Sequence, residues 1–255
     1  MHEISPFLAA RWPRVASGEA DWLVELAGDF VTGMMAPPMP DAVWVLNAMD
    51  ENEALPGDVS HDEDLRAANV GVALPRGVAT GGGLGRADHP GDGWRRLRWA
   101  ELARRSGDEV VREDYLPCLH CFPLAMKNGS WPLSIRPPTE GSLDRPTYDR
   151  LIEVLIEQSP QGADTRCVAY YNPLMFASVD VDNLHLRMGR LGDAKALYDN
   201  PEVEYGPSNL WAADRSWVTY TDYDLWGTKV CGPASLVEAL LDDREIEAFR
   251  LPERR

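Results

Sequence analysis

The sequence predicts an α+β fold, in which a mixed or mainly antiparallel sheet is flanked by a few amphipathic helices. Three observations lead to this prediction. Short apolar runs of strand length outnumber the helical stretches, the two kinds of element do not alternate regularly, and glycine and proline residues separate them. A regular strand–helix alternation would have indicated a parallel sheet instead. The chain has 255 residues, 44% of them hydrophobic, which is enough to bury a sizeable core.

Two segments in the first half of the chain have the apolar spacing of amphipathic helices. Residues 17–33 begin at Ser17, a residue type that caps helix N-termini, and place apolar side chains on one face. Residues 94–105 interleave apolar side chains with arginines and form the one basic stretch of an acidic chain. Between them, residues 75–93 are rich in glycine, which predicts a long loop of the kind that carries function.

The second half of the chain contains the clearest helix. Asp144 suits its N-cap and Pro146 its first turn. A final helix is expected over residues 235–241, where Ser235 and Glu238 have the spacing of a capping box. Strands are expected over residues 43–46, 167–171, 184–188, 216–221, 228–231 and 247–251.

A proline-rich stretch at residues 123–138 indicates a boundary between two regions. Residues 1–130 would then form an acidic N-terminal α/β region that carries the glycine-rich loop 75–93. Residues 131–255 would form a C-terminal α+β region. One continuous domain is the alternative.

The formal net charge of −16 bears on the partners of the protein. It disfavours binding to nucleic acid or to an anionic membrane, both of which need a basic surface. Residues 1–60 hold ten acids against two arginines, and an acidic face attracts basic proteins. We therefore expect a protein partner of basic character that contacts Asp50, Glu51 and Glu53. A solubilising surface without a partner is the alternative.

No targeting signal stands out in the sequence. No apolar run reaches the roughly 18 residues that a membrane-spanning helix needs. The first residues lack the basic and then apolar pattern of a signal peptide. We expect a cytoplasmic protein, in which the four cysteines stay reduced.

The tetrapeptide Cys118-Leu119-His120-Cys121 is the most metal-like motif of the chain. Cys118, His120 and Cys121 could share one metal ion, with Cys167 or Cys231 as a further ligand. A structural zinc site usually has a second closely spaced ligand pair, however, and Cys167 and Cys231 are single and fall on expected strands. We therefore expect structural cysteines, no metal and no other cofactor.

Two carboxylates, Asp222 and Asp224, are the candidates for catalysis. At i, i+2 spacing on a strand they would point to one face, as a cation site or an acid–base pair requires. At a strand end they are equally suited to a turn. Neither a nucleophilic serine motif nor a complete phosphate-binding loop accompanies them.

The aromatic segment around residues 211–217 has two interpretations. Trp211 and Trp217 would be core residues, with Asp214 and Arg215 pairing to fix the turn between them. Alternatively, these four residues would form an exposed binding surface.

Five segments of the second half form a signature: Trp131-Pro132, Pro138 to Asp144, Pro207 to Trp217, Thr221 to Leu225 and Thr228 to Gly232. Through these segments the chain, from about residue 131 to 251, resembles an uncharacterised family of proteins from high-GC, actinomycete-type bacteria. The excess of arginine over lysine agrees with a high-GC source. The family has no known activity, so the resemblance implies only a bacterial, cytoplasmic accessory protein.

Two functional hypotheses follow. In the first, the chain is a binding or accessory protein, for example an immunity-type protein that neutralises a basic toxin or enzyme. In the second, it is a small hydrolase or transferase that uses Asp222 and Asp224, with loop 75–93 as a lid. The sequence leaves the oligomeric state undetermined.

Overall fold

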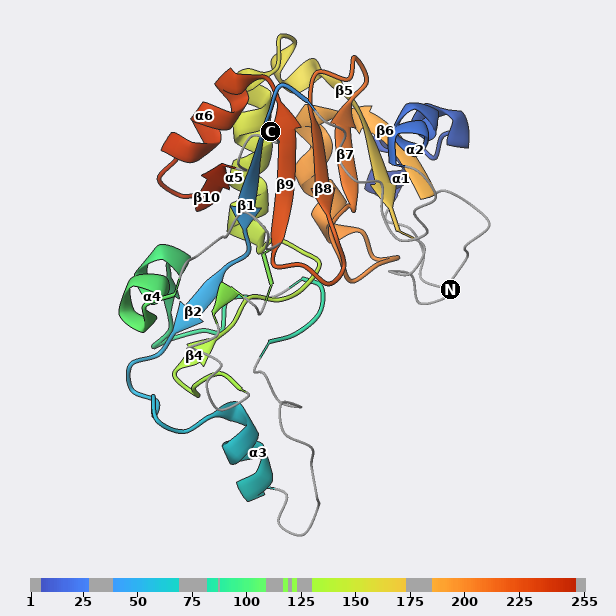
Figure 1. Ribbon diagram of the computed structural model, residues 1–255. Coiled ribbons are helices and arrows are strands. Elements are labelled where there is room, and N and C mark those ends of the chain that lie inside the picture. The colour runs from blue at the N-terminus through green and yellow to red at the C-terminus, as the bar shows by residue number, and fades with distance from the viewer. Residues whose placement is uncertain are drawn as a thin grey trace.

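A seven-stranded antiparallel sheet forms the centre of the molecule, and a three-stranded antiparallel sheet lies beneath it (Figure 1). The α+β prediction is confirmed. The strand order of the large sheet is β10-β1-β9-β8-β7-β5-β6, and that of the small sheet is β3-β2-β4. The computed structural model describes residues 6–27, 39–68, 82–86, 88–108, 117–118, 121–122, 130–172 and 185–250.

The bounds of the elements are as follows. The large sheet contains β1 (Asp41–Leu46), β5 (Arg166–Tyr171), β6 (His185–Arg190), β7 (Asn209–Ala212), β8 (Val218–Thr221), β9 (Gly227–Gly232) and β10 (Ala248–Arg250). The small sheet contains β2 (Met49–Glu51), β3 (Arg95–Leu97) and β4 (Ile135–Arg136). The helices are α1 (Pro6–Arg11), η1 (Ser17–Ala20), α2 (Asp21–Ala27), α3 (His61–Ala68), α4 (Trp99–Ser106), α5 (Arg145–Gln158), η3 (Gly162–Asp164), η5 (Leu191–Asp199) and α6 (Ala234–Asp242).

Both faces of the large sheet are buried. Along β5, Cys167, Ala169 and Tyr171 join the core beneath α5 and α6. Val168 and Tyr170 alternate with them and join a second core on the opposite face. This two-sided burial explains why the strands read as continuous apolar runs although the sheet is antiparallel.

The second core joins the large sheet to the small one. Four aromatic residues stack there, which we call the tryptophan cluster: Trp99, Phe122, Trp131 and Trp226. Trp99 and Phe122 have ring centroids 5.0 Å apart, within the range that favours tilted aromatic pairs. The chain also connects the sheets directly, because β1 runs through Asn47 into β2.

Helix α5 forms where the sequence predicts it. Asp144 caps its N-terminus by accepting a hydrogen bond from the Thr147 N–H at 3.3 Å, and Pro146 lies in the first turn. Leu151 and Leu155 are buried on the face toward the sheet. The capping residue marks the start of the helix and the apolar stripe marks its buried face, so both signals predicted the same helix.

Two helix predictions need correction. Residues 17–33 form the short helix η1 and then α2, which ends at Ala27, and the remainder of that range lies outside the described residues. Residues 94–105 are not one helix, because Arg95–Leu97 pair with β2 as strand β3 and α4 starts at Trp99. Arg98 between them is extended, with φ −75° and ψ 140°.

Smaller corrections concern single elements. Helix α6 follows Pro233 and has no side-chain cap, so the expected capping role of Ser235 is wrong. Strand β7 was not predicted, because its four residues include Asn209 and follow Pro207 closely. In the part of the chain that is described, no helix is long and apolar enough to cross a membrane.

Strand β1 comes from the first half of the chain, and its neighbours in the sheet come from the end. It lies between β9 and β10, pairing with both in antiparallel register. The large sheet is therefore built from both of the regions that the sequence delimits at residue 130.

Candidate functional site

The acids expected to meet a basic partner are largely neutralised within the protein. Asp50 and Glu51 lie in β2, and each is 8% exposed. The Glu51 carboxylate accepts hydrogen bonds from Arg95 and, at 2.7 Å, from Arg105 of α4. Glu53 is exposed and pairs with Arg95 at 3.3 Å. The basic stretch of the sequence therefore neutralises Glu51 and Glu53, and Asp50 is buried, so residues 50–53 do not form a free acidic face.

Unpaired acids gather elsewhere, beside the turn between β8 and β9. We call this surface the tyrosine–carboxylate patch. It consists of Glu140, Glu204, Tyr205, Asp222, Tyr223 and Asp224. Within the described ranges, none of its four carboxylates lies at ion-pair distance from an arginine or lysine side chain.

Backbone hydrogen bonds bring the segments of the patch together. Glu140 donates its N–H to the Gly83 carbonyl at 2.9 Å and accepts from the Gly85 N–H at 2.7 Å. The Arg86 N–H donates to the Glu204 carbonyl at 2.8 Å. Residues 82–86 of the glycine-rich loop therefore lie directly against the patch, with Leu84 63% exposed beside it.

Gly141 holds the tyrosines of the patch close to the backbone. It has φ +79°, in the left-handed region that favours glycine. A Cβ atom at this position would lie 2.8 Å from both the Tyr205 ring and the Tyr223 carbonyl oxygen. Its N–H donates to the Leu225 carbonyl at 2.9 Å, which fixes the strand-end turn beside Glu140.

Like charges perturb the carboxyls of the patch. Burial raises the pKa of Glu140, and the charge of Asp224 adds to the effect. Burial also raises the pKa of Asp224, assisted by its hydrogen bond and repulsion with Asp222. The Tyr220 hydroxyl donates a hydrogen bond to Asp222. The patch thus holds repelling, partly desolvated carboxylates, a situation that an approaching cation relieves.

The catalytic candidates Asp222 and Asp224 therefore do lie together, with Glu140 as an additional neighbour. Sequence reasoning found the pair through its i, i+2 spacing. It missed Glu140, Glu204 and Tyr205, because these residues come from separate segments and no local pattern marks them. Loop 75–93 was expected beside the pair, and its residues 82–86 bond to the backbone of Glu140 and Glu204, at the edge of the patch.

The cysteines do not converge. Cys118 is partly buried and Cys121 fully buried, and the Cys121 N–H donates to the Cys118 carbonyl at 3.0 Å. Burial raises the pKa of the Cys121 thiol to about 11. Cys167 and Cys231 belong to the cores on opposite faces of the large sheet. His120 lies outside the described residues.

Of the described residues, no group of three His, Cys, Asp or Glu side chains could hold a metal ion. The carboxylates of the patch are thus near one another without forming a chelating set. Their arrangement suits an extended cationic surface better than a single bound ion, because hard cations need several converging oxygen ligands.

Trp211 and Trp217 are core residues, 1% and 2% exposed, so neither is available to a partner at the surface. The Trp217 indole N–H donates to the Ser159 hydroxyl at 2.9 Å. Asp214 shapes the turn between the tryptophans by accepting from the Ser216 N–H at 3.0 Å. The expected pairing of Asp214 with Arg215 is wrong: among the described residues the two form no ion pair, and the Arg215 guanidinium instead lies 5.2 Å from the centroid of the Trp22 ring.

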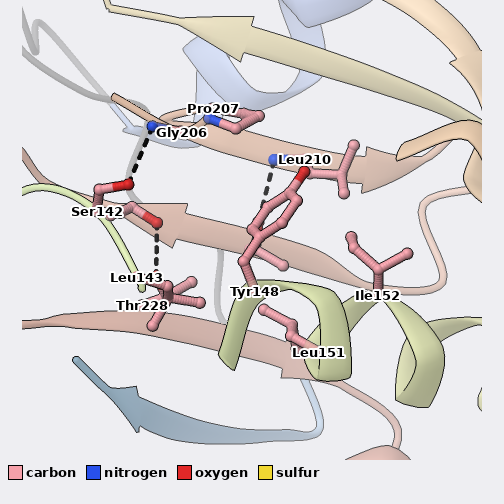
Figure 2. Close-up of a pocket in the computed structure, with 11 residues that line it drawn as sticks. Ser142, Leu143, Tyr148, Leu151, Ile152, Gly206, Pro207, Leu210 and Thr228 are labelled. Carbon is pink, nitrogen blue, oxygen red and sulfur yellow. Dashed lines mark hydrogen bonds between the residues drawn. The ribbon is translucent and has the colours of Figure 1, made fainter. Parts of the chain in front are cut away.

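A small cavity lies between α5 and the large sheet (Figure 2). Its volume of about 20 Å³ suits a single water molecule. The polar groups around it bond to one another: Thr221 and Thr228 share a hydrogen bond of 2.7 Å, and the Gly206 N–H donates to Ser142 at 3.1 Å. This cavity is part of the core and is too small for an organic substrate.

Comparisons with models of protein families, with curated proteins and with solved structures found no match. The resemblance to a family of actinomycete-type proteins therefore stays a prediction. Functional inference has to rest on the geometry and charge of the chain itself.

Proposed function

We propose that this chain is a binding protein that holds a basic protein partner against the tyrosine–carboxylate patch. The observation that carries the proposal is the group of four carboxylates without an ion-pair partner among the described residues, beside two half-buried tyrosines. Elsewhere the chain pairs acids such as Glu51 and Glu202 with arginine. An acidic patch that lacks such internal partners is suited to receive lysine and arginine side chains from another protein.

Charge and composition support the same function. A formal net charge of −16 speeds the encounter with a basic protein, and tyrosine supplies contact area at low entropic cost. Leu84, 63% exposed at the edge of the patch, adds an apolar anchor. These features fit an accessory protein that neutralises a basic toxin or enzyme inside the cell that makes it.

The test removes the charge of the patch while keeping its shape. The variant carries Glu140→Gln, Glu204→Gln, Asp222→Asn and Asp224→Asn. The unaltered chain is used to capture its partner from the native host, and the partner is then identified, purified and measured by surface plasmon resonance. We expect a basic partner whose association rate falls with rising salt, and at least about tenfold weaker binding by the variant.

A matched control separates the patch from the overall charge. Replacing Glu19, Glu25, Asp242 and Glu245, all exposed and outside the patch, by the corresponding amides also reduces the formal net charge from −16 to −12. This control should keep most of the affinity. Equal losses in the two variants, or an acidic partner, would show that the patch is not the binding surface.

A second candidate function rests on Asp224, whose pKa is raised by burial and by its hydrogen bond with Asp222. A carboxyl that keeps its proton beside an ionised one can act as a general acid, as in a hydrolase or transferase. Screening hydrolase and transferase substrates with the unaltered chain, Asp222→Asn and Asp224→Asn tests this idea. An activity that neither replacement lowers would place the chemistry elsewhere.

A further inference from the structure

Asp50 occupies the middle of the small sheet, between two arginines. In the register of the sheet it lies opposite Arg96 of β3 on one side and opposite Arg136 of β4 on the other. Residues directly opposite one another in antiparallel strands point to the same face. The three side chains therefore share the face opposite to that of Met49 and Leu97, which are core residues.

Neither arginine donates a hydrogen bond to Asp50. Arg96 donates to the Asp144 carboxylate at 3.2 Å and, at 3.5 Å, to the Thr147 hydroxyl. Arg136 donates to the Asp88 carbonyl oxygen at 2.7 Å. Asp50 is 8% exposed, and in the described part of the chain its carboxyl accepts no hydrogen bond. Its carboxylate oxygens keep some contact with solvent, so a ligand can reach them and supply the missing hydrogen-bond donor.

Arg136 has spare donors on the same face. It forms no ion pair with a carboxylate in the described ranges, and its one described hydrogen bond goes to a neutral carbonyl. The charged groups around Asp50 are His89, Arg96, Arg136 and Asp144. Arg96 is engaged by Asp144, so Arg136 remains to attract an anion. The Nδ1 atom of His89 accepts a hydrogen bond from the Gly91 N–H at 3.1 Å, which leaves its Nε2 atom to donate to a ligand.

The geometry points to a binding site for hydrogen phosphate, in which Arg136 and His89 hold the oxyanion and Asp50 accepts a hydrogen bond from its P–OH group. The ligand has to supply an acceptor to Arg136 and a donor to Asp50. Hydrogen phosphate has both. Arginine is well suited to the charged oxygens, because its fork of donors matches the geometry of phosphate.

The carboxyl of Asp50 makes the site selective among anions of similar shape. Sulfate carries no proton at neutral pH, so its oxygens would face the Asp50 carboxylate without a hydrogen bond. Methyl phosphate behaves like sulfate at pH 7.5, because the last proton of a phosphate monoester leaves with a pKa of about 6. A site built around a hydrogen bond rejects analogues that cannot form it.

The burial of Asp50 adds a pH dependence. Burial raises the pKa of Asp50 and is the largest effect. The neighbouring His89, Arg96 and Arg136 lower this pKa, and the charge of Asp144 raises it further. As the pH falls, Asp50 becomes protonated, and its carboxyl can then donate a hydrogen bond to a sulfate oxygen. The preference for phosphate over sulfate should therefore be largest at neutral pH and narrow toward acidic pH.

The test is isothermal titration calorimetry of the full chain at pH 7.5 and fixed ionic strength. Inorganic phosphate should bind at least about tenfold more tightly than sulfate or methyl phosphate. Equal binding of phosphate and sulfate would overturn the proposal, as would the absence of phosphate binding. This comparison uses the unaltered chain, so it stands even if a variant does not fold.

Two replacements locate the site. Arg136→Gln should abolish phosphate binding, whereas Arg104→Gln, which alters an exposed arginine of α4, should leave it unchanged. Asp50→Asn should admit sulfate, because the amide donates a hydrogen bond where the carboxylate repels. Phosphate binding that survives Arg136→Gln, or sulfate exclusion that survives Asp50→Asn, would contradict the assignment. None of these residues belongs to the tyrosine–carboxylate patch, so the outcome is independent of the proposed protein partner.

Discussion

Arg187 of β6 is buried, 3% exposed, and depends on one carboxylate for its charge balance. It pairs with Glu202 at 2.8 Å and donates to the Trp12 carbonyl at 3.0 Å. Replacing Glu202 by Gln leaves a buried guanidinium without its counter-charge. We expect the free energy of unfolding to fall by about 3 kcal/mol, measured by urea denaturation.

An exposed pair provides the control for this prediction. Arg190 and Asp164 are joined at 3.0 Å, with side chains 66% and 78% exposed. Asp164→Asn should lower the free energy of unfolding by less than about 1 kcal/mol. If both replacements cost the same, burial is not what makes the Glu202 pair matter.

The thiols should differ in reactivity according to burial. Cys121, Cys167 and Cys231 are buried, and Cys118 is partly exposed. Burial raises the pKa of Cys121 and Cys231 to about 11, so few of these thiols are reactive thiolates at pH 8. We expect iodoacetamide to modify about one cysteine per native chain, with Cys118 identified by mass spectrometry, and all four after denaturation. Rapid modification of Cys121 in the native chain would contradict its burial.

Single residues were predictable where their partners are close in sequence. Asp144 was identified as a cap because Pro146 follows it in the first turn of the helix. The Arg187 pair and the electrostatic influence of Asp224 on Glu140 had no local signal, because folding joins separate segments there. The core or surface placement of Trp211 was also open in the sequence, since aromatic side chains suit both.

Helix α4 shows how an element can depend on a distant residue. Its N-cap residue, Arg98, makes no capping hydrogen bond with its side chain. Instead the Glu247 carboxylate, just before β10, accepts from the N–H groups of Trp99 and Ala100, each at 2.9 Å. Glu247 thereby satisfies two of the free donors at the helix start and faces the positive end of its dipole.

Removing this cap should weaken α4. We expect Glu247→Ala to lower the free energy of unfolding by about 2 kcal/mol, at the upper end for a cap because two donors lose their acceptor. Glu245→Ala, an exposed neighbour, should have little effect in the same chemical denaturation series. A loss no larger for Glu247 than for Glu245 would show that the cap is dispensable.

The capping also explains why the prediction of one helix over residues 94–105 was wrong. Apolar spacing continues across Leu97 into α4, so periodicity gives no sign of a break. The break arises because Arg95 and Arg96 pair with β2, and because Glu247 offers the helix a start at Trp99. Both causes are tertiary. The longer helix α5 is capped by Asp144, the residue just before it, so its start could be predicted from the local sequence.

At the scale of the whole molecule, pH should act on the charge of the patch. Asp224 has a raised pKa in the folded chain, so between its unfolded and folded values the native state binds more protons than the unfolded state. Its contribution to stability is therefore present at low pH and lost as the pH rises through the folded pKa. The pKa of Glu140 is also raised, so its contribution to stability depends on pH in the same direction.

Asp224→Asn should therefore raise the melting temperature at pH 7, and the gain should shrink as the pH approaches 4. Differential scanning calorimetry across this range checks the prediction. Asp242→Asn, at an exposed carboxyl of α6, serves as the control for a simple loss of one charge. A gain that is the same for both replacements at every pH would assign the effect to net charge and not to the patch.

The position of β1 between β9 and β10 has a consequence for how the protein folds. Residues 41–46 pair with strands that are synthesised almost 200 residues later, so β1 cannot take its place in the large sheet until most of the chain has been made. Until then, the apolar strand β1 has two unpaired edges, the condition under which nascent chains associate wrongly. Closing this sheet should accordingly be a slow step, and one in which a holdase chaperone would be of use.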